Sequence, residues 1–302
     1  MTNAGSNVAW PLPSRRSGRI EAISPLQTFL EALPLSRLHM PETGVTAFAF
    51  SPVNALSKLA LDKWTATAIE GAVVLASGDD VRLMPTGGKE AYWHAMLSQL
   101  EAKKNLMLVP EWAASGLRKN YKVLKQHDEY IMTTDAVKSF AGGRNASLRN
   151  QINKARKICT VEVYTSSNEA EYLALNALWY RQNVTLKFRT YDKTSIDWLI
   201  KNWIDVTKVV PDAIMLGVRF DGKLISLNIG SGLCATMWTS YTFRYDREAP
   251  VKASNMLGYQ SLASHFPKLG YENDGTADTA GIRAWKDRLM LTKIPFFKIT
   301  KA

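Results

Sequence analysis

The chain has 302 residues, of which 46% are hydrophobic and 22% charged, a balance that excludes a largely disordered protein. Its 38 lysines and arginines outnumber 27 acidic residues, and the resulting net charge of +11 favours polyanionic partners such as tRNA or DNA. Two cysteines and four histidines form no metal or redox motif, and no apolar run reaches the roughly 18 residues of a membrane span. We therefore expect a cytoplasmic protein with no metal and no transmembrane segment.

The first half alternates predicted strands and helices, as an α/β layer fold does. Residues 1–19 show little periodicity and predict a flexible arm. Ser24-Pro25 predicts the start of a short helix, with a hydroxyl cap followed by proline at the first helical position. Further strands and helices are predicted at about 53–61, 64–69, 72–76, 81–84, 89–100, 106–109, 129–134 and 135–140.

A strongly basic helix is predicted over 144–158. Apolar residues recur on it at intervals of four and three and predict a buried stripe. Three polar residues follow the same spacing one position on and border that stripe: Arg149, Asn153 and Arg156. Two interpretations are open: a solvated basic face, or a surface that holds the phosphate of tRNA, coenzyme A or another anion.

The second half contains a predicted β-hairpin, in which Asp221-Gly222 joins the apolar runs 214–220 and 223–229. A β-rich run at 237–243 and an amphipathic helix over 254–269 follow it. This order of hairpin, strand and helix, closed by a further strand, resembles the catalytic half of GNAT-type acyltransferases. A strand at 160–164 and helices at about 168–187 and 194–207 are predicted before the hairpin.

Three stretches carry a resemblance to a more specific family. Residues 128–143 place an acidic-Tyr strand before a Gly-Gly turn, 148–153 read Leu-Arg-Asn-Gln-Ile-Asn, and 281–286 read Gly-Ile-Arg-Ala-Trp-Lys. Over about residues 20 to 300 the chain resembles the soluble C-terminal domain of phosphatidylglycerol lysyltransferases, which is related to the Fem-type aminoacyltransferases.

The resemblance implies an α/β fold of tandem GNAT-like mixed sheets flanked by helices. On this basis we expect an N-terminal GNAT-like domain at 20–143 and a C-terminal catalytic one at 144–302. It also implies an enzyme that transfers an acyl or aminoacyl group, in the best-known members from aminoacyl-tRNA to a lipid head group. The membrane-spanning region of those lysyltransferases has no counterpart here, so we expect a small-molecule or nucleic-acid acceptor rather than a lipid.

The predicted connection before the last helix bears on the donor. GNAT enzymes hold the coenzyme A pyrophosphate on glycine-rich backbone at a helix N-terminus. The corresponding residues 247–254 contain no glycine, and Pro250 lacks an amide hydrogen. This favours aminoacyl-tRNA as the donor and no tightly bound cofactor. Acetyl-CoA stays the alternative, because Lys252 and Ser254 could still hold a phosphate at the helix N-terminus.

Acyl transfer needs a group that takes the proton of the attacking nucleophile and donors that stabilise the oxyanion. Asp274 and Asp278 are the candidate catalytic carboxylates; the alternative for each is a turn residue or a helix cap. Arg283 and Lys286, at i and i+3 of one predicted helix, are candidates to bind phosphate or a substrate carboxylate. Tyr241 could line the acceptor site, although aromatic residues in strands more often serve packing.

The sequence thus predicts an aminoacyltransferase that moves an aminoacyl group from aminoacyl-tRNA to an amine or a hydroxyl. One alternative is an acyl-CoA-dependent N-acyltransferase that modifies an amine such as that of a nucleic-acid base. The other is a non-catalytic GNAT-like module that binds nucleic acid. The missing glycines argue against coenzyme A, whereas the region of Lys286 argues against a module without activity.

Overall fold

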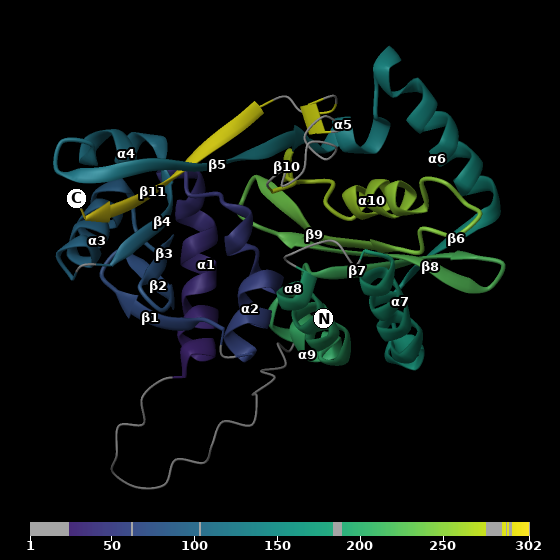
Figure 1. Ribbon diagram of the computed structural model, residues 1–302, viewed down its shortest axis with the longest axis horizontal. Coiled ribbons are helices and arrows are strands. Elements are labelled where there is room, and N and C mark those ends of the chain that lie inside the picture. Colours follow the sequence, from purple (N-terminus) through teal and green to yellow (C-terminus); the bar gives the residue numbers. More distant parts are fainter. Residues whose placement is uncertain are drawn as a thin grey trace, which may run out of the picture.

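The computed structural model describes residues 24–301 apart from 62, 103, 184–188, 276–285, 288 and 290–291. Within this part the chain forms one mixed 11-stranded sheet with helices on both faces (Figure 1). The strands are β1 (Thr65–Ile69), β2 (Ala72–Ser77), β3 (Asp80–Pro85), β4 (Asn105–Pro110), β5 (Tyr121–Thr133), β6 (Cys159–Val163), β7 (Ile214–Phe220), β8 (Lys223–Gly232), β9 (Met237–Tyr245), β10 (Tyr271–Asn273) and β11 (Thr292–Lys301). The helices are α1 (Pro25–Thr43), α2 (Pro52–Ala60), α3 (Lys89–Glu101), α4 (Glu111–Leu117), α5 (Thr134–Ser139), α6 (Ala146–Ile158), α7 (Glu169–Gln182), α8 (Arg189–Lys201), α9 (Trp203–Val209) and α10 (Ser254–Ser264).

The sheet contains the same arrangement twice. In the first half, β1, β2 and β3 form an antiparallel meander, and α3 leads to β4, which is parallel to β3. In the second half, β6 to β9 form the meander, and α10 leads to β10, which is parallel to β9. This duplication confirms the predicted fold class, tandem α/β units of mixed sheet flanked by helices.

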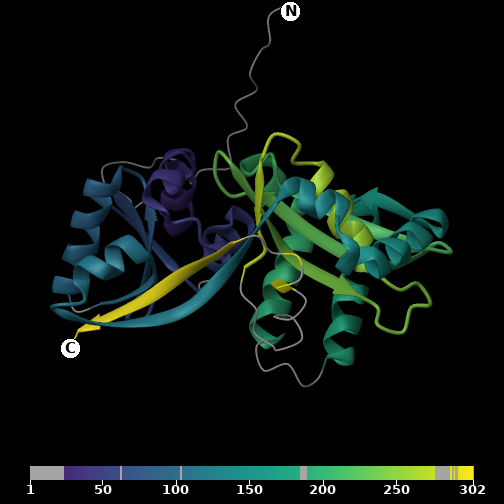
Figure 2. The same ribbon diagram turned by 90° about the horizontal axis from the view of Figure 1, so that it is seen from above.

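Two long strands join the halves. The strand order is β1-β2-β3-β4-β11-β5-β10-β9-β8-β7-β6, so β11 lies beside β4 and β5 lies beside β10. β5 and β11 pair along most of their lengths and form the long ribbon that runs from the C-terminus to the middle of the molecule in Figure 2. A strand from the sequence range 144–302 therefore completes the sheet of the range 20–143. The domain boundary after residue 143 stays a prediction.

Local sequence accounts for the ends of several elements. Ser24 caps α1, because its Oγ accepts a hydrogen bond of 3.2 Å from the amide of Gln27. In the β7–β8 hairpin Asp221 and Gly222 have φ values of 50° and 74°, as the predicted tight turn requires. The helix α1 is longer than the short helix that was predicted: it has 19 residues, although Pro34 lies inside it.

Packing explains the length of α1 and the position of α10. The buried residues of α1, such as Phe29 and Met40, belong to the apolar core that α1 shares with β1 to β3, and this burial outweighs the helix-breaking effect of proline. The helix α10 covers β7, β8 and β9. Gly258 permits this close approach, because a Cβ there would lie 1.9 Å from Nδ2 of Asn228 on β8.

Candidate functional site

The short strand β10 lies where the two halves meet. It pairs with β5 on one side and, through Tyr271–Asn273 against Met237–Thr239, with β9 on the other. β9 continues to Tyr245, so within the described residues the two parallel strands part after Asn273. The carboxyl ends of neighbouring parallel strands that part are a common location for ligands in α/β proteins. We therefore take the end of β10 as the centre of the candidate site.

A β-bulge lies on β9 next to this point. Gly230 of β8 is opposite Ser240, and Ile229 is opposite Thr242, so Tyr241 is the extra residue on β9. Tyr241 is buried in the apolar core that includes α1 and α2, whereas Trp238 belongs to the other core, under α10. The acceptor-lining role of Tyr241 stays a prediction.

Two predicted site residues, Asp274 and Lys286, form a buried ion pair. The ammonium of Lys286 lies 3.1 Å from Oδ2 of Asp274, and both side chains are at most 5% exposed. The same ammonium donates hydrogen bonds to the carbonyl oxygens of Asp274 and Gly275. It also lies 5.4 Å from the centre of the Tyr130 ring on β5. This environment holds a positive charge at the carboxyl end of β10.

A second carboxyl group, that of Glu272, lies on the same side of β10 because side chains alternate along a strand. Glu272 is completely buried, and Oγ of Ser240 lies 2.8 Å from its Oε1 and 3.3 Å from Oδ1 of Asp274. Burial, and then the charge of Asp274, raise the pKa of Glu272 well above its ordinary value. Burial also raises the pKa of Asp274, although the charge of Lys286 opposes this shift.

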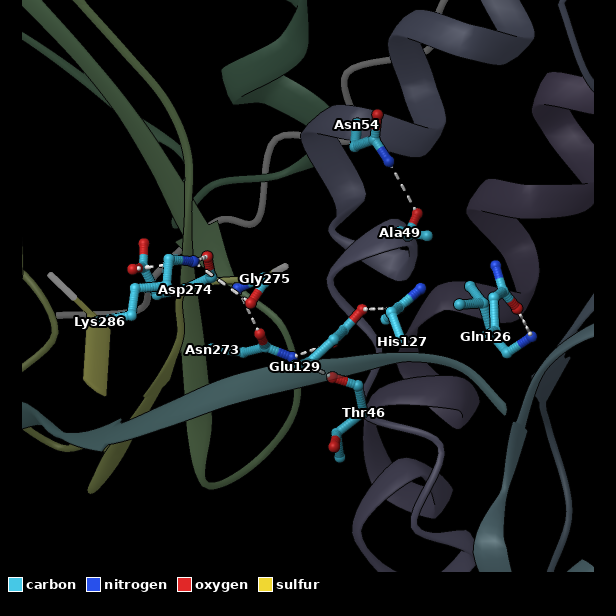
Figure 3. A network of polar contacts seen from close by, with 11 residues as sticks. Thr46, Ala49, Asn54, Gln126, His127, Glu129, Asn273, Asp274, Gly275 and Lys286 are labelled. Atoms are coloured by element: carbon cyan, nitrogen blue, oxygen red, sulfur yellow. Dashed lines mark hydrogen bonds and ion pairs between the residues drawn. The ribbon is translucent and has the colours of Figure 1, made fainter. Parts of the chain in front are cut away.

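Asn273 points to the opposite side of β10 and connects three segments of the chain (Figure 3). Its Nδ2 donates hydrogen bonds of 2.7 Å to the carbonyl oxygen of Thr46 and 2.6 Å to Oε2 of Glu129, which is buried on β5. Its Oδ1 accepts a hydrogen bond of 2.7 Å from the amide of Gly275. His127 lies 3.4 Å from the other oxygen of Glu129. These contacts fix the turn that presents Asp274.

The polar residues predicted on the basic helix make contacts within the protein. Arg149 donates hydrogen bonds of 2.6 Å to the carbonyl oxygens of Phe140 and Gly142. Arg156 donates to the side chains of Asn153 and of Gln260 on α10. Figure 1 shows α6 over the outer end of α10 rather than at β10. The structure therefore does not bring Arg149, Asn153 and Arg156 together with Asp274, and their phosphate-binding role stays a prediction.

The remaining predicted residues lie at the start of α10 or outside the described part of the chain. Lys252 is exposed, whereas Ser254, the first residue of α10, is 2% exposed. Ala253 precedes the helix with a φ of 62°, a conformation that usually favours glycine. Asp278 and Arg283 lie outside the described residues.

Other features of the described chain do not add to this site. A cavity of about 240 Å³ lies elsewhere and has only uncharged lining residues. They come from β6, the start of β7, α9 and the segments beside them: Val163, Tyr164, Thr165, Ser166, Trp203, Ile204, Thr207, Ala213, Ile214 and Met215. Among the described residues, no group of three histidine, cysteine or acidic side chains could hold a metal ion. None of the described helices is both long and apolar enough to cross a bilayer.

Sequence reasoning missed Glu272, Ser240 and the network of Asn273 with Glu129. The sequence did contain a signal for Glu272: three consecutive polar residues, Glu272 to Asp274, follow the predicted helix and precede a glycine. For Asp274 the sequence left a turn residue as the alternative to a catalytic carboxylate, and it did not indicate that the preceding Asn273 is the last residue of a buried strand. That Ser240 lies between two carboxyl groups depends on the pairing of β9 with β10.

Comparison with known proteins gives a family match. The sequence model of the family "Phosphatidylglycerol lysyltransferase, C-terminal" matches residues 62–273, which is more than half of the chain. No curated protein matches the chain. The match includes β1 to β10 but ends one residue before Asp274.

Three solved structures share the fold. A conserved protein of unknown function from Bacteroides thetaiotaomicron has a TM-score of 0.73 and 14% identity, over 87% of this chain and 96% of that chain. The protein named L-PGS from Bacillus licheniformis has a TM-score of 0.64 and 14% identity, over 92% of each chain. The protein FemX has a TM-score of 0.62 and 12% identity, over 89% of this chain and 95% of that chain. Such low identities establish the fold alone.

Proposed function

The chain belongs to the family of phosphatidylglycerol lysyltransferase C-terminal domains, and from this premise we propose that it transfers an aminoacyl group from aminoacyl-tRNA to an amine or hydroxyl acceptor. The observation that carries the proposal is the buried ion pair of Lys286 and Asp274 at the end of β10. It holds a carboxylate and an ammonium group together at the point where β9 and β10 part. Acyl transfer requires a proton acceptor and a donor that stabilises the oxyanion.

In the proposed reaction the acceptor nitrogen or oxygen attacks the ester carbonyl carbon of the aminoacyl-tRNA. Asp274 takes the proton that the acceptor loses, and the charge of Lys286 stabilises the negative oxygen of the tetrahedral intermediate. The bond between the carbonyl carbon and the ribose oxygen then breaks. The proton passes from Asp274 to that oxygen, so the products are the aminoacylated acceptor and tRNA with a free 3′-terminal hydroxyl.

The start of α10 supports tRNA rather than coenzyme A as the donor. The connection from β9 contains Pro250 and no glycine, and Ser254 at the first turn is buried. The net charge of +11 also suits a polyanionic donor. An acyl-CoA donor stays the second candidate, because α10 lacks a side-chain cap and the exposed Lys252 lies at its start.

A donor comparison on the purified protein tests the proposal. Thermal unfolding is followed with charged tRNA, with the same tRNA after deacylation, and with acetyl-CoA. A ligand at one hundred times its dissociation constant adds about 2.7 kcal/mol to the unfolding free energy. We expect stabilisation by tRNA that is larger for the charged form and absent with acetyl-CoA. Stabilisation by acetyl-CoA alone would overturn the proposal, and an equal effect of charged and uncharged tRNA would favour a binding module.

A further inference from the structure

We infer that Glu272 is held as a neutral carboxylic acid and that, through Ser240, it positions Asp274 as the ionised member of the pair. The protonation of Glu272 follows from the contacts of the folded protein alone. Its consequence for turnover rests on the proposed function. Glu272 would then be a positioning residue, because it acts on the reacting groups only through Ser240 and Asp274.

The hydroxyl of Ser240 has a single hydrogen but contacts two carboxyl groups. Its Oγ lies within hydrogen-bond distance of two carboxyl oxygens, at 2.8 Å from Glu272 and 3.3 Å from Asp274. A serine hydroxyl has one hydrogen to donate and can accept others. Two full hydrogen bonds, in contrast to one hydrogen shared between two acceptors, require that one carboxyl carries a proton and donates it to Ser240.

The position of Lys286 decides which carboxyl carries that proton. Lys286 lies 3.1 Å from Asp274 and favours its ionised form. Glu272 forms no ion pair with a described lysine, arginine or histidine, although it is completely buried. The chain of hydrogen bonds therefore runs from the Glu272 acid to Ser240 and from Ser240 to the Asp274 carboxylate.

The charges around Glu272 agree with this assignment. Among the described residues, the titratable groups that act on it are Asp274 just after its own strand, Tyr259 on α10 and Lys286. Two carboxylates so close to each other would place two buried negative charges beside the Lys286 ammonium, so one proton is shared by the pair. Burial and then the charge of Asp274 raise the pKa of Glu272, and they outweigh the opposing contact with Ser240, the charge of Lys286 and the contact with Tyr259. With Glu272 neutral, Asp274 is the carboxylate that pairs with Lys286 among the described residues.

A consequence for turnover follows. The hydrogen bond from Ser240 stabilises the ionised form of Asp274, the form that can accept a proton from the acceptor. When Glu272 ionises at higher pH, it competes for the hydrogen of Ser240 and adds a second buried anion. Activity should therefore fall on the alkaline side as Glu272 loses its proton. Glutamine at 272 has no proton to lose and can still donate to Ser240.

Infrared spectroscopy tests the protonation without any substrate. We expect the difference spectrum between the wild type and Glu272→Gln at neutral pH to contain the carbonyl band of a carboxylic acid. The same difference for Glu129→Gln is the matched control, since Glu129 is equally buried but bonded to Asn273. Carboxylate bands in place of the acid band for Glu272 would overturn the inference. Should Glu272→Gln fail to fold, the acid band is followed in an alkaline titration of the wild type, and its absence would have the same meaning.

The pH profile of transfer tests the consequence. Glu272→Gln should stay within about tenfold of wild-type kcat/KM at neutral pH and lose the alkaline decrease. Ser240→Ala should lower kcat by about ten- to a hundredfold, the value of a lost hydrogen bond to a charged group. An alkaline decrease that is identical in Glu272→Gln and the wild type would contradict the positioning role. If the infrared result holds but no donor is consumed, the proposed function fails while the protonation of Glu272 stands.

Discussion

The ammonium group of Lys286 lies 3.1 Å from the carboxylate of Asp274, and both side chains are almost wholly excluded from solvent. Each charge depends on the other, because an isolated buried ion costs several kcal/mol. The segment that carries Lys286 is thereby attached to the carboxyl end of β10. This pair links the stability of the site with its chemistry.

Removal of the Lys286 ammonium should therefore lower both the stability of the protein and its activity. We expect Lys286→Ala to lower the unfolding free energy by about 3–5 kcal/mol, because it removes the cation that pairs with the buried Asp274 carboxylate, and to abolish turnover. Lys293→Ala is a matched control: Lys293 also lies against the Tyr130 ring, at 5.1 Å, but its pair with Asp287 is exposed. It should leave the unfolding free energy nearly unchanged, because exposed ion pairs contribute little. Urea unfolding measures the unfolding free energy of both variants, and equal losses would show that the buried pair stabilises the protein no more than the exposed one.

The raised pKa of Glu272 predicts a pH-dependent difference in stability. In the unfolded chain Glu272 ionises near its ordinary pKa of 4.5, whereas the folded protein keeps the proton to higher pH. Between these two values the unfolded state binds fewer protons, so stability falls as pH rises, by about 1.4 kcal/mol per pH unit. Glu272→Gln has no such proton, so its unfolding free energy should rise relative to that of the wild type from about pH 4.5 upward. A difference that is constant with pH, measured by urea unfolding at several pH values, would refute the shift.

Asn273 should contribute to stability mainly through Glu129. Asn273→Ala removes the hydrogen bond of 2.6 Å to that buried carboxylate and the one to Thr46. We expect a loss of about 2–4 kcal/mol, since each unsatisfied buried group costs roughly 1–3 kcal/mol. Asn202→Ala, which removes one bond to the Trp198 carbonyl on a partly buried helix end, should cost about 1 kcal/mol. If chemical denaturation gives similar losses for Asn273→Ala and Asn202→Ala, the bonds of Asn273 contribute no more to stability than a partly buried hydrogen bond does.

Local signals in the sequence predicted much of the fold. The Asp221-Gly222 turn, the Ser24 cap and the apolar stripe of α6 depend on neighbours within a few residues, and the structure has all three. The last strand, β11, was not predicted. Pro295 lacks an amide hydrogen and disfavours a strand, but it lies just before the residues that pair with β4.

The candidate site was predictable only in part. The resemblance and the acid–base requirement pointed to Asp274 and Lys286, but not to their contact. Contacts such as that of Ser240 with Glu272 join residues 32 positions apart and arise from strand register, which no local pattern encodes. The cations of α6 were interpreted as one surface, whereas Arg149 and Arg156 use their guanidinium groups within the protein.

If α6 contacts tRNA, its exposed lysines should carry the interaction. Lys154 and Lys157 are exposed, unlike Arg149, which is partly buried. The double substitution of Lys154 and Lys157 by Ala should weaken tRNA binding and reduce the slope of log affinity against log salt by about 2. Fluorescence anisotropy over a salt series measures this slope. The matched control is Lys122→Ala with Lys125→Ala on β5, and an equal reduction in both variants would show that α6 has no special role.

The most direct test is transfer from tRNA charged with radiolabelled amino acids, in the presence of acetyl-CoA and of mixed amine and hydroxyl acceptors. We expect the wild type to move label from tRNA to an acceptor, and Asp274→Asn to do so about 10² to 10⁴ times more slowly because it lacks the base. Label that stays on tRNA while acetyl-CoA is consumed would contradict an aminoacyl-tRNA donor. Equal rates for the wild type and Asp274→Asn would remove Asp274 from the reaction.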